Sequence, residues 1–323
     1  YADPAAMSRA LIAAARDTGI RLTLLPVLYM RGGFDGRPLA ERQRRFGHDL
    51  DGFLRLFETL RALEDETLRV GVAFHSLRAV PPEAMSAALA ALPAGTPLHI
   101  HIAEQIGEVQ DCLALRNARP VEWLLDHAPV DLHWTLVHAT HLTAEETAGI
   151  ARSGATVAIC PTTEANLGDG LFPLRAYLDA GGTWGIGSDS HISVSPVEEL
   201  RWLEYGQRLH TRRRNIAVDG VGQSVGESLL HGTLASGAHA SGQAVGVLAP
   251  GMAADWIELE ASAPTFAGAR PEDVVDRWLF SGNRNLVRQV HVAGQAVVVD
   301  GRHRQAEAIT ARYRQVVARL LAD

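Results

Sequence analysis

Six short apolar runs of β type alternate with helical patterns from the first residue to about residue 240, and this alternation constrains the fold most strongly. Nearly continuous apolar runs, each followed by a helical pattern, are typical of a parallel sheet that helices cover. Six strands are too few to close a barrel of eight, and a doubly wound sheet is also built from six, so the number leaves both architectures open. No Gly-rich phosphate loop follows any of the runs. The expected strands are Ile20–Met30, Leu68–Ser76, Pro97–Ala103, Trp134–Ala139, Ala155–Pro161 and Thr183–Ser188.

Signals for helix starts and stops fit the same alternation. Asp3-Pro4 is typical of an N-cap followed by the first helical residue, and Gly19 is typical of the position after a helix end. Apolar residues at helical spacing predict an amphipathic helix that contains Phe53, Leu56, Phe57, Leu60 and Leu63. S/T-x-x-E capping boxes predict three later helix starts, at Thr143 with Glu146, Ser195 with Glu198 and Ser224 with Glu227.

The pattern changes after about residue 243. Short strand-like runs separated by turns appear in AVGVLAPGMAADWIELE and in VRQVHVAGQAVVVDGRH, with a helical segment between them. These runs predict a small β-rich module. We therefore expect two domains, residues 1–242 and residues 243–323.

Charge and cysteine usage exclude several functional classes. The formal net charge is −7, and the one cationic run, Arg212-Arg213-Arg214, ends an amphipathic stretch, where we interpret it as a solvated helix end. The chain therefore lacks the basic surface that nucleic-acid binding requires. Two cysteines, Cys112 and Cys160, suit neither a disulfide framework nor a cysteine-rich metal site, and they favour the reducing cytoplasm. No run of 18 apolar residues occurs, so we expect no membrane span.

Polar side chains gather where the predicted strands end, which is where parallel βα proteins place their active sites. LHIHIAE ends in His101 and Glu104, LVHATH contains His138, and WGIGSDSH contains Asp189. Imidazole and carboxylate are the usual ligands of a catalytic zinc ion, and a carboxylate beside the ion can carry protons. VAFHSLR adds His75 and Arg78 at a fourth strand end. The combination predicts a catalytic centre.

Each of these residues also has an ordinary structural interpretation. A single histidine at a strand end is more often a hydrogen-bonded structural residue, and an aspartate before a helix is usually a cap. We interpret His99 as structural because it alternates with the next histidine along the strand, and Cys160 as an inert buried thiol. His141 and His191 are assigned with equal weight to the surroundings of the site or to the surface.

The motifs HIHIAE, VHATH and GSDSH resemble, in this order, the amidohydrolase superfamily at barrel strands five, six and eight. GVLAPGMAADWIELE and VHVAGQAVVVDGR resemble its flanking β-sandwich. The resemblance covers essentially the whole chain and is greatest to the deiminases that act on formimidoylglutamate. It implies an α/β fold, a (β/α)₈ TIM-type barrel of which strands three to eight lie in this chain, with part of a small flanking β-sandwich and terminal helices. The stretches that carry it are LTLLPVLYMRGGFDG, GVAFHSLRAV, HIHIAEQ, ICPTTEANLGDGLFP and GIGSDSHISVSPVEELRWLEYGQRL.

The resemblance also implies roles for the site residues and one zinc ion per chain. His101 is implied as a metal ligand, and Asp189 as a ligand that also takes a proton from the attacking water. Glu104 is implied as the general acid/base, and His138 as the residue that orients the water and stabilises developing charge. The His-x-His motif that the family carries at the end of strand one is absent here, since His99-Ile100-His101 belongs to the strand-five position. We therefore expect further ligands upstream of Tyr1, either in a longer polypeptide or in a part of the sequence that was not recorded.

The implied reaction is hydrolysis of N-formimidoyl-L-glutamate to N-formyl-L-glutamate and ammonia, a step of histidine degradation. His75 and Arg78 are implied as contacts to this small substrate, and Arg78 is the best visible partner for one of its carboxylates. The resemblance suggests a homodimer. Two alternatives stay open, namely another deaminase acting on a nucleobase, nucleoside, guanidine or amidine, and an inactive barrel that binds a ligand. Nucleoside and nucleobase deaminases of the superfamily usually carry an asparagine-containing motif where this chain has CPTTEANLGDG.

Overall fold

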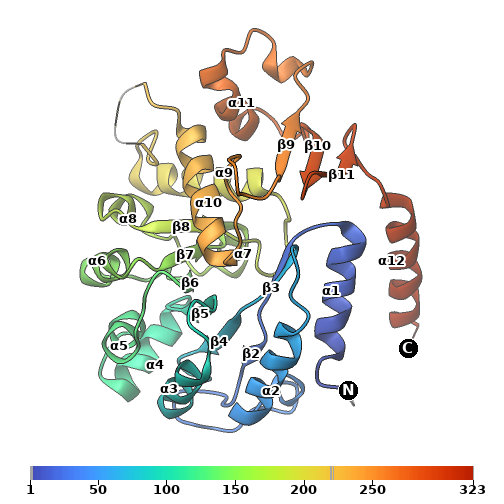
Figure 1. Ribbon diagram of the computed structural model, residues 1–323. Coiled ribbons are helices and arrows are strands. Elements are labelled where there is room, and N and C mark those ends of the chain that lie inside the picture. The colour runs from blue at the N-terminus through green and yellow to red at the C-terminus, as the bar shows by residue number, and fades with distance from the viewer. Residues whose placement is uncertain (1–2, 219, 221, 323) are drawn as a thin grey trace.

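A parallel sheet of six strands forms the centre of the protein in the computed structural model, which describes residues 3–218, 220 and 222–322 (Figure 1). The strand order is β2-β4-β5-β6-β7-β8, so each strand pairs with the one that precedes it in this sheet. A doubly wound sheet would reverse its order at a switch point. The order therefore settles the question that the number of strands left open, because a sheet that grows in one direction is the wall of a barrel. The strands are β2 (Val27–Leu28), β4 (Val72–Ser76), β5 (Leu98–Ile102), β6 (Trp134–His138), β7 (Thr156–Ile159) and β8 (Thr183–Ile186).

Helices follow the strands and cover the sheet. Figure 1 shows α5, α6 and α8 along its outer side; α5 packs against both α4 and α6, and α10 packs against β8. Most positions of β4 and β6 are buried on both faces, as expected for parallel strands between helices and a barrel interior, whereas on β5 buried residues alternate with the half-buried His99 and His101. The helices of this part are α1 (Ala6–Thr18), α2 (Leu50–Arg61), α3 (Pro82–Ala91), α4 (Ile106–Arg116), α5 (Pro120–His127), α6 (Ala144–Ser153), α7 (Pro161–Leu167), α8 (Leu174–Asp179), α9 (Pro196–Thr211) and α10 (Val225–Ser241), with the 3₁₀ turn η1 (Arg44–Phe46).

Two of the predicted strands are wrong, because each is divided into two shorter strands in the structure. Ile20–Met30 is divided into β1 (Leu22–Leu24) and β2, and Leu68–Ser76 is divided into β3 (Leu68–Val70) and β4. Pro26 interrupts the first because it has no N–H to give to a ladder. Gly71 interrupts the second at a close approach, since a Cβ there would lie 2.5 Å from the carbonyl oxygen of Pro97. As a result β1 and β3 form a separate two-stranded parallel sheet.

The predicted helix ends are mostly confirmed. Gly19 ends α1 in the left-handed conformation, with φ of 74°. The helix begins later than predicted, however, because Asp3 accepts the N–H of Ala5 and the turn through Pro4 precedes it. Thr143 forms a complete capping box with Glu146. Ser195 and Ser224 also cap their helices, but Glu198 bonds to Ser193 instead of completing a box.

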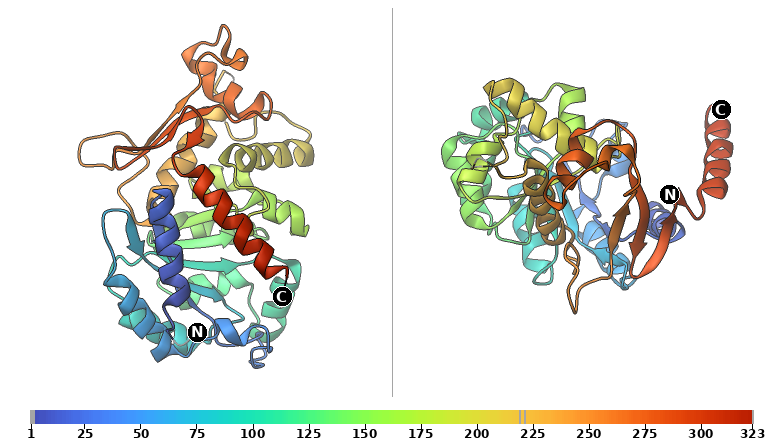
Figure 2. Two further views of the ribbon diagram at one scale, coloured as in Figure 1. Left: turned by 90° about the vertical axis from the view of Figure 1, so that its right-hand side faces the viewer. Right: turned by 90° about the horizontal axis from the view of Figure 1, so that it is seen from above.

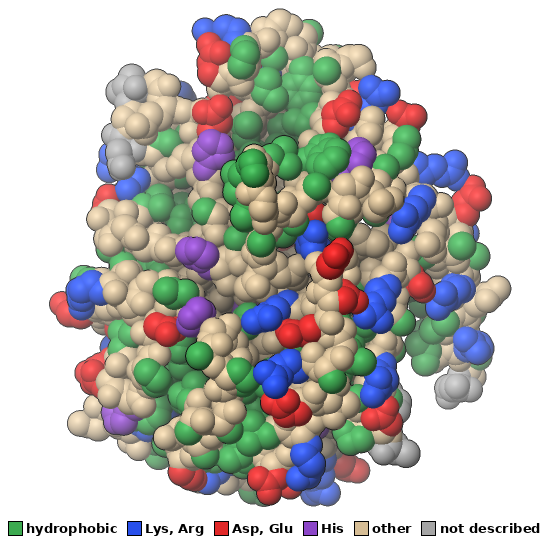
Figure 3. Space-filling view, in the orientation of Figure 1, with side chains coloured by type: hydrophobic (Ala, Val, Ile, Leu, Met, Phe, Trp, Pro, Cys, Tyr) green, Lys and Arg blue, Asp and Glu red, His purple; other side chains and the backbone are tan. Residues whose placement is uncertain are grey.

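An antiparallel sheet of four strands, in the order β12-β11-β10-β9, forms the C-terminal module (Figures 1 and 2). Arg21 ties it to the barrel part through Asp255, with 2.6 Å between Nε and Oδ2. Apolar side chains gather in the upper part of Figure 3, where Figure 1 places β9 and α11. Trp256 and Ile257 of β9 are exposed. The elements are β9 (Trp256–Leu259), η2 (Pro264–Phe266), η3 (Pro271–Asp273), α11 (Val274–Phe280), β10 (Val287–Val292), β11 (Gln295–Val299), β12 (Arg302–His303) and α12 (Ala306–Leu320). Among the residues that the structure describes, no helix is long and apolar enough to cross a bilayer.

A buried carboxylate ties the start of α5 to the loop that leaves the carboxyl end of β6. Glu146 is 3% exposed; its Oε2 accepts the N–H of Thr143 at 2.8 Å and pairs with Arg119 Nε at 2.7 Å. Arg119 also donates to the carbonyl oxygen of His141 at 2.6 Å. The pair thus holds the start of α5 against the loop before α6. Removal of the arginine would leave a buried, uncompensated charge.

We predict that Arg119→Met lowers the free energy of unfolding by about 3 kcal/mol, as is typical when one partner of a buried ion pair is lost. Urea denaturation followed by circular dichroism measures this. Arg9→Met is the control, because Arg9 pairs with Asp3 on the surface at 3.4 Å and both side chains are about half exposed; it should cost less than about 1 kcal/mol. Equal losses in the two variants would contradict a structural role for the buried pair.

Candidate metal and catalytic site

The carboxyl ends of β5, β6 and β8 bring three predicted site residues together. His101 lies on β5, His138 is the last residue of β6, and Asp189 lies in the loop after β8. One ligand atom from each of the three lies within 4.8 Å of the others. Two imidazole nitrogens and a carboxylate oxygen at that separation are a donor set that a single zinc ion accepts. The donor set therefore fits a metal.

The backbone at these strand ends is strained. Ala103, His138, Ala139 and Asp189 all have positive φ, between 45° and 69°, although none is glycine. Left-handed conformations of such residues cost free energy and persist only where the surroundings impose them. The strain turns the chain sharply after each strand, so that the side chains of His138 and Asp189 face the same space.

His101 presents one free nitrogen to this space. Its Nδ1–H donates to the carbonyl oxygen of His75 at 2.8 Å, and a carbonyl can only accept, so the lone pair of the neutral ring lies on Nε2. Burial lowers the pKa of His101, which keeps the ring neutral. A neutral imidazole with a fixed tautomer is ready to bind a metal.

Glu104 and His138 face each other across the site. The distance from Glu104 Oε1 to His138 Nε2 is 3.9 Å. Burial raises the pKa of the Glu104 carboxyl, and the nearby carboxylates of Asp169 and Asp189 raise it further. A carboxyl group with a raised pKa can hold a proton closer to neutral pH, as a general acid must. The backbone N–H of Glu104 is anchored at 3.0 Å by the buried Glu108 carboxylate.

Glu164, which sequence reasoning did not single out, lies behind His138. Its Oε1 lies 3.2 Å from His138 Nδ1, and both side chains are buried. Burial by itself would lower the pKa of His138, but the hydrogen bond to Glu164 and the surrounding carboxylates outweigh it and raise the pKa. The motif CPTTEANLGDG contains Glu164, and the signal that could have found it is a carboxylate in the first turn of the helix that follows β7, on the same sheet edge.

Arg78 is half-buried and has no hydrogen bond or ion pair to any residue that the structure describes. Glu83, an acidic residue that follows Arg78 closely in the chain, pairs with Arg31 at 3.3 Å. The Arg78 guanidinium lowers the pKa of both His75 and Glu104, as the smallest of the contributions to each. A half-buried cation without a counterion is suited to an anionic ligand.

His75 lies at the carboxyl end of β4, near the metal donor His101 and near Tyr29, a residue that the sequence did not indicate. Its ring stacks on Tyr29 with centroids 4.2 Å apart and on the other side approaches His101 at 5.5 Å. Burial lowers the pKa of His75 to about 4, and the proximity of His101 and of the Arg78 guanidinium disfavours its charged form further. His75 is therefore a neutral hydrogen-bonding group at neutral pH.

The loop that carries Asp189 is held by α7. The hydroxyl of Thr163 donates to the carbonyl oxygen of Ser188 at 3.0 Å and lies 2.8 Å from the hydroxyl of Ser190. The residues on both sides of Asp189 are thus attached to one buried side chain. This attachment explains how an exposed aspartate keeps its place beside the half-buried His101 and the buried His138.

The remaining predicted polar residues lie outside this cluster. His99 donates to the carbonyl oxygen of Ala240 at 2.8 Å, which confirms its structural interpretation. His141 is half-buried, and His191 is exposed. Cys160 is a free, buried thiol. It lies near His138 and Glu164, and burial raises the pKa of its thiol far above the ordinary range.

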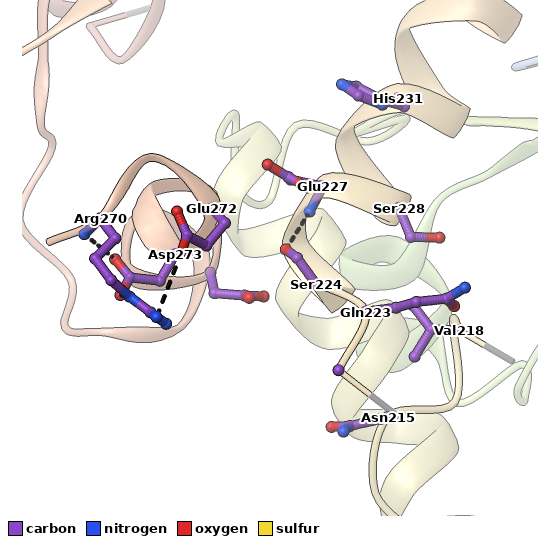
Figure 4. A pocket seen from close by; sticks show the side chains of 12 residues that line it. Asn215, Val218, Gln223, Ser224, Glu227, Ser228, His231, Arg270, Glu272 and Asp273 are labelled. Atoms are coloured by element: carbon purple, nitrogen blue, oxygen red, sulfur yellow. Dashed lines mark hydrogen bonds and ion pairs between the residues drawn. The ribbon is translucent and has the colours of Figure 1, made fainter. Parts of the chain in front are cut away.

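A separate surface cavity of about 650 Å³ lies where α10 begins, opposite η3 (Figure 4). Its polar side chains serve the fold. Ser224 accepts the N–H of Glu227 at 3.0 Å, and Asp276 accepts the N–H of Gly226 at 2.7 Å. Figure 4 shows Arg270 turned toward Asp273, with which it is paired. None of the predicted site residues lines this cavity, and we interpret it as the junction of α10 with the C-terminal module.

Comparison with known proteins agrees with this geometry. The sequence matches the model of the amidohydrolase family over residues 4–297. A formimidoylglutamate deiminase of Pseudomonas aeruginosa is 49% identical over 322 residues, which cover 99% of this chain and 71% of that protein.

Solved structures show the same fold. An amidohydrolase from Brucella melitensis has a TM-score of 0.93 and 42% identity, over 99% of this chain and 71% of that one. An adenosine deaminase from Xanthomonas campestris with bound zinc has a TM-score of 0.78 over 96% of this chain and 69% of that one, at 21% identity, which shows the fold alone. The predicted α/β fold of TIM-barrel type is thereby confirmed.

Proposed function

Because the chain belongs to the amidohydrolase family, we propose that it hydrolyses N-formimidoyl-L-glutamate to N-formyl-L-glutamate and ammonia. The half-buried Arg78 guanidinium, which has no partner among the residues that the structure describes, is the observation that carries this proposal, because such a cation at the carboxyl end of the sheet is suited to bind a substrate carboxylate. The 49% identity to a formimidoylglutamate deiminase supports the same substrate. It also favours an enzyme over an inactive binding protein.

We propose one zinc ion per chain, held by His101 and Asp189, with further ligands from a His-x-His motif outside this chain. Zinc bound there would supply a water molecule with its pKa lowered to about 7, and polarisation of the substrate. The fixed Nε2 lone pair of His101 and the carboxylate of Asp189 support this assignment. A location in the cytoplasm and a homodimeric assembly stay predictions from cysteine usage and from the family resemblance.

The residues around these donors supply the proton transfers that the reaction needs. Water adds to the formimidoyl carbon, and Asp189 takes a proton from that water. The bond from this carbon to the terminal nitrogen then breaks, and ammonia can leave only when the nitrogen is protonated. Glu104 delivers this proton, which its raised pKa favours. His138, at 3.9 Å from Glu104, orients the water through Nε2 as a neutral ring, and stabilises the charge that develops on oxygen in its protonated form, which its raised pKa favours.

The glutamate end of the substrate binds away from these donors. Arg78 presents a planar guanidinium, which can bind a carboxylate through two parallel hydrogen bonds. His75, held neutral by burial, adds a hydrogen-bonding group on the same strand end. The pair would thus orient the substrate so that the formimidoyl carbon reaches Glu104 and Asp189.

We predict that Glu104→Gln lowers kcat by about 10²- to 10⁴-fold and leaves the metal content nearly unchanged, because the residue carries protons and is not a ligand. Asp189→Asn should lower both turnover and metal content. Ammonia release from N-formimidoyl-L-glutamate and metal analysis of the same samples measure these effects. Retention of more than about a tenth of the wild-type rate by Glu104→Gln would refute its proton-transfer role.

For Arg78→Met we expect a loss in kcat/KM of about 10²-fold or more, since removing one partner of a buried charge pair costs about 2–5 kcal/mol. For a substrate analogue without the carboxylate that Arg78 binds, the same variant should lose far less in kcat/KM. Arg61→Met is a matched control, because Arg61 pairs on the surface with Glu58 of the same helix at 3.1 Å and leaves the site unchanged. Equal losses on both substrates would mean that Arg78 supports the fold and not specificity.

A further inference from the structure

We propose that Glu164 is a positioning residue that fixes the proton of neutral His138 on Nδ1 and thereby presents the Nε2 lone pair to the reacting atoms. The tautomer follows from the contacts of Glu164 alone. Its importance for turnover rests on the function proposed above for His138.

The contacts of one carboxylate oxygen establish the direction of the hydrogen bond. Glu164 Oε1 accepts the backbone N–H of Cys160 at 2.9 Å and lies 3.2 Å from His138 Nδ1. An oxygen that accepts from an N–H is the acceptor toward a second nitrogen as well, unless it carries a proton of its own. His138 therefore donates through Nδ1–H. The opposite tautomer would set the Nδ1 lone pair directly against a carboxylate oxygen, because a separation of 3.2 Å leaves no room for another atom between them.

The His138 ring has little freedom to escape this arrangement. It stacks on His101, with centroids 5.7 Å apart and planes 20° from parallel, and its backbone is held at φ of 69°. Its Nε2 consequently stays directed at Glu104 Oε1, 3.9 Å away, with no donor proton when the ring is neutral. Carboxylates that orient a site histidine in this way typically contribute about 10- to 100-fold to activity or metal affinity.

A simpler role for Glu164 would be to anchor the start of α7 through the Cys160 N–H. Another buried glutamate already provides a matched case. Glu199 on α9 accepts the N–H of Thr162 at 2.9 Å and its hydroxyl at 2.6 Å, and is 2% exposed. It holds the same turn of α7, but its hydrogen bonds go to Thr162 and not to His138. A variant of Glu199 therefore reports what loosening of α7 does by itself.

The test is the tautomer of His138 in the intact protein. With ¹⁵N-labelled histidine and at alkaline pH, where the imidazole is neutral, the metal-free protein should show a protonated Nδ1 and an unprotonated Nε2, assigned by their loss in His138→Asn. Glu164→Ala should shift the population toward the Nε2–H tautomer. Glu164→Gln should largely restore the wild-type tautomer, because its amide oxygen accepts from the same two N–H groups. Glu199→Ala should leave the tautomer unchanged.

In steady-state assays Glu164→Ala should lower kcat by about 10- to 100-fold with little change in KM, and Glu164→Gln should recover part of the loss. A wild-type Nε2–H tautomer would overturn the proposal, even if Glu164→Ala failed to fold. The proposal would also be overturned if Glu164→Ala left the tautomer unchanged, or if Glu199→Ala shifted the tautomer to the same extent as Glu164→Ala. Since the tautomer is measured without substrate, failure of the deiminase function would leave this result intact.

Discussion

The parallel hydrogen-bonded ladders from β4 to β8 are the constraint on which the site depends. They pair Ile102 with His138 and join Ser76 to His101, so the carboxyl ends of neighbouring strands share one edge of the sheet. Residues separated by tens of positions in the chain thus meet without any long loop. A one-residue change of register would turn His101 to the opposite face and remove it from the donor set.

Buried glutamates form a second layer of support around that edge. Glu108, Glu146, Glu164, Glu199 and Glu204 are all nearly inaccessible to solvent, and each accepts at least one backbone N–H of a loop or helix start. A buried carboxylate is tolerated only when such donors compensate its charge. The strained turns at the strand ends are therefore held by charged hydrogen bonds and not by apolar packing alone. Loss of any one carboxylate would release the loop that it holds.

The sequence was sufficient to predict the strand ends and their polar residues, because nearly continuous apolar runs followed by helices leave few alternatives. His101, Glu104, His138 and Asp189 follow from that pattern together with the family motifs. Glu164 could not be predicted in the same way, since its contact to His138 spans 26 positions and depends on two strands being neighbours. The interruptions at Pro26 and Gly71 were also missed, because close approach to Pro97 is a property of the packed fold. The unpaired state of Arg78 likewise depends on Glu83 turning to Arg31.

The central claim is that this site breaks the bond between the formimidoyl carbon and its terminal nitrogen. The most direct measurement is product analysis after turnover of N-formimidoyl-L-glutamate in H₂¹⁸O by the intact protein. The account predicts N-formyl-L-glutamate with one ¹⁸O atom in the formyl group and one ammonia per turnover. Formation of glutamate and formamide would contradict it, because the other C–N bond would then have been cleaved. Absence of ¹⁸O from the formyl group would contradict hydrolysis itself.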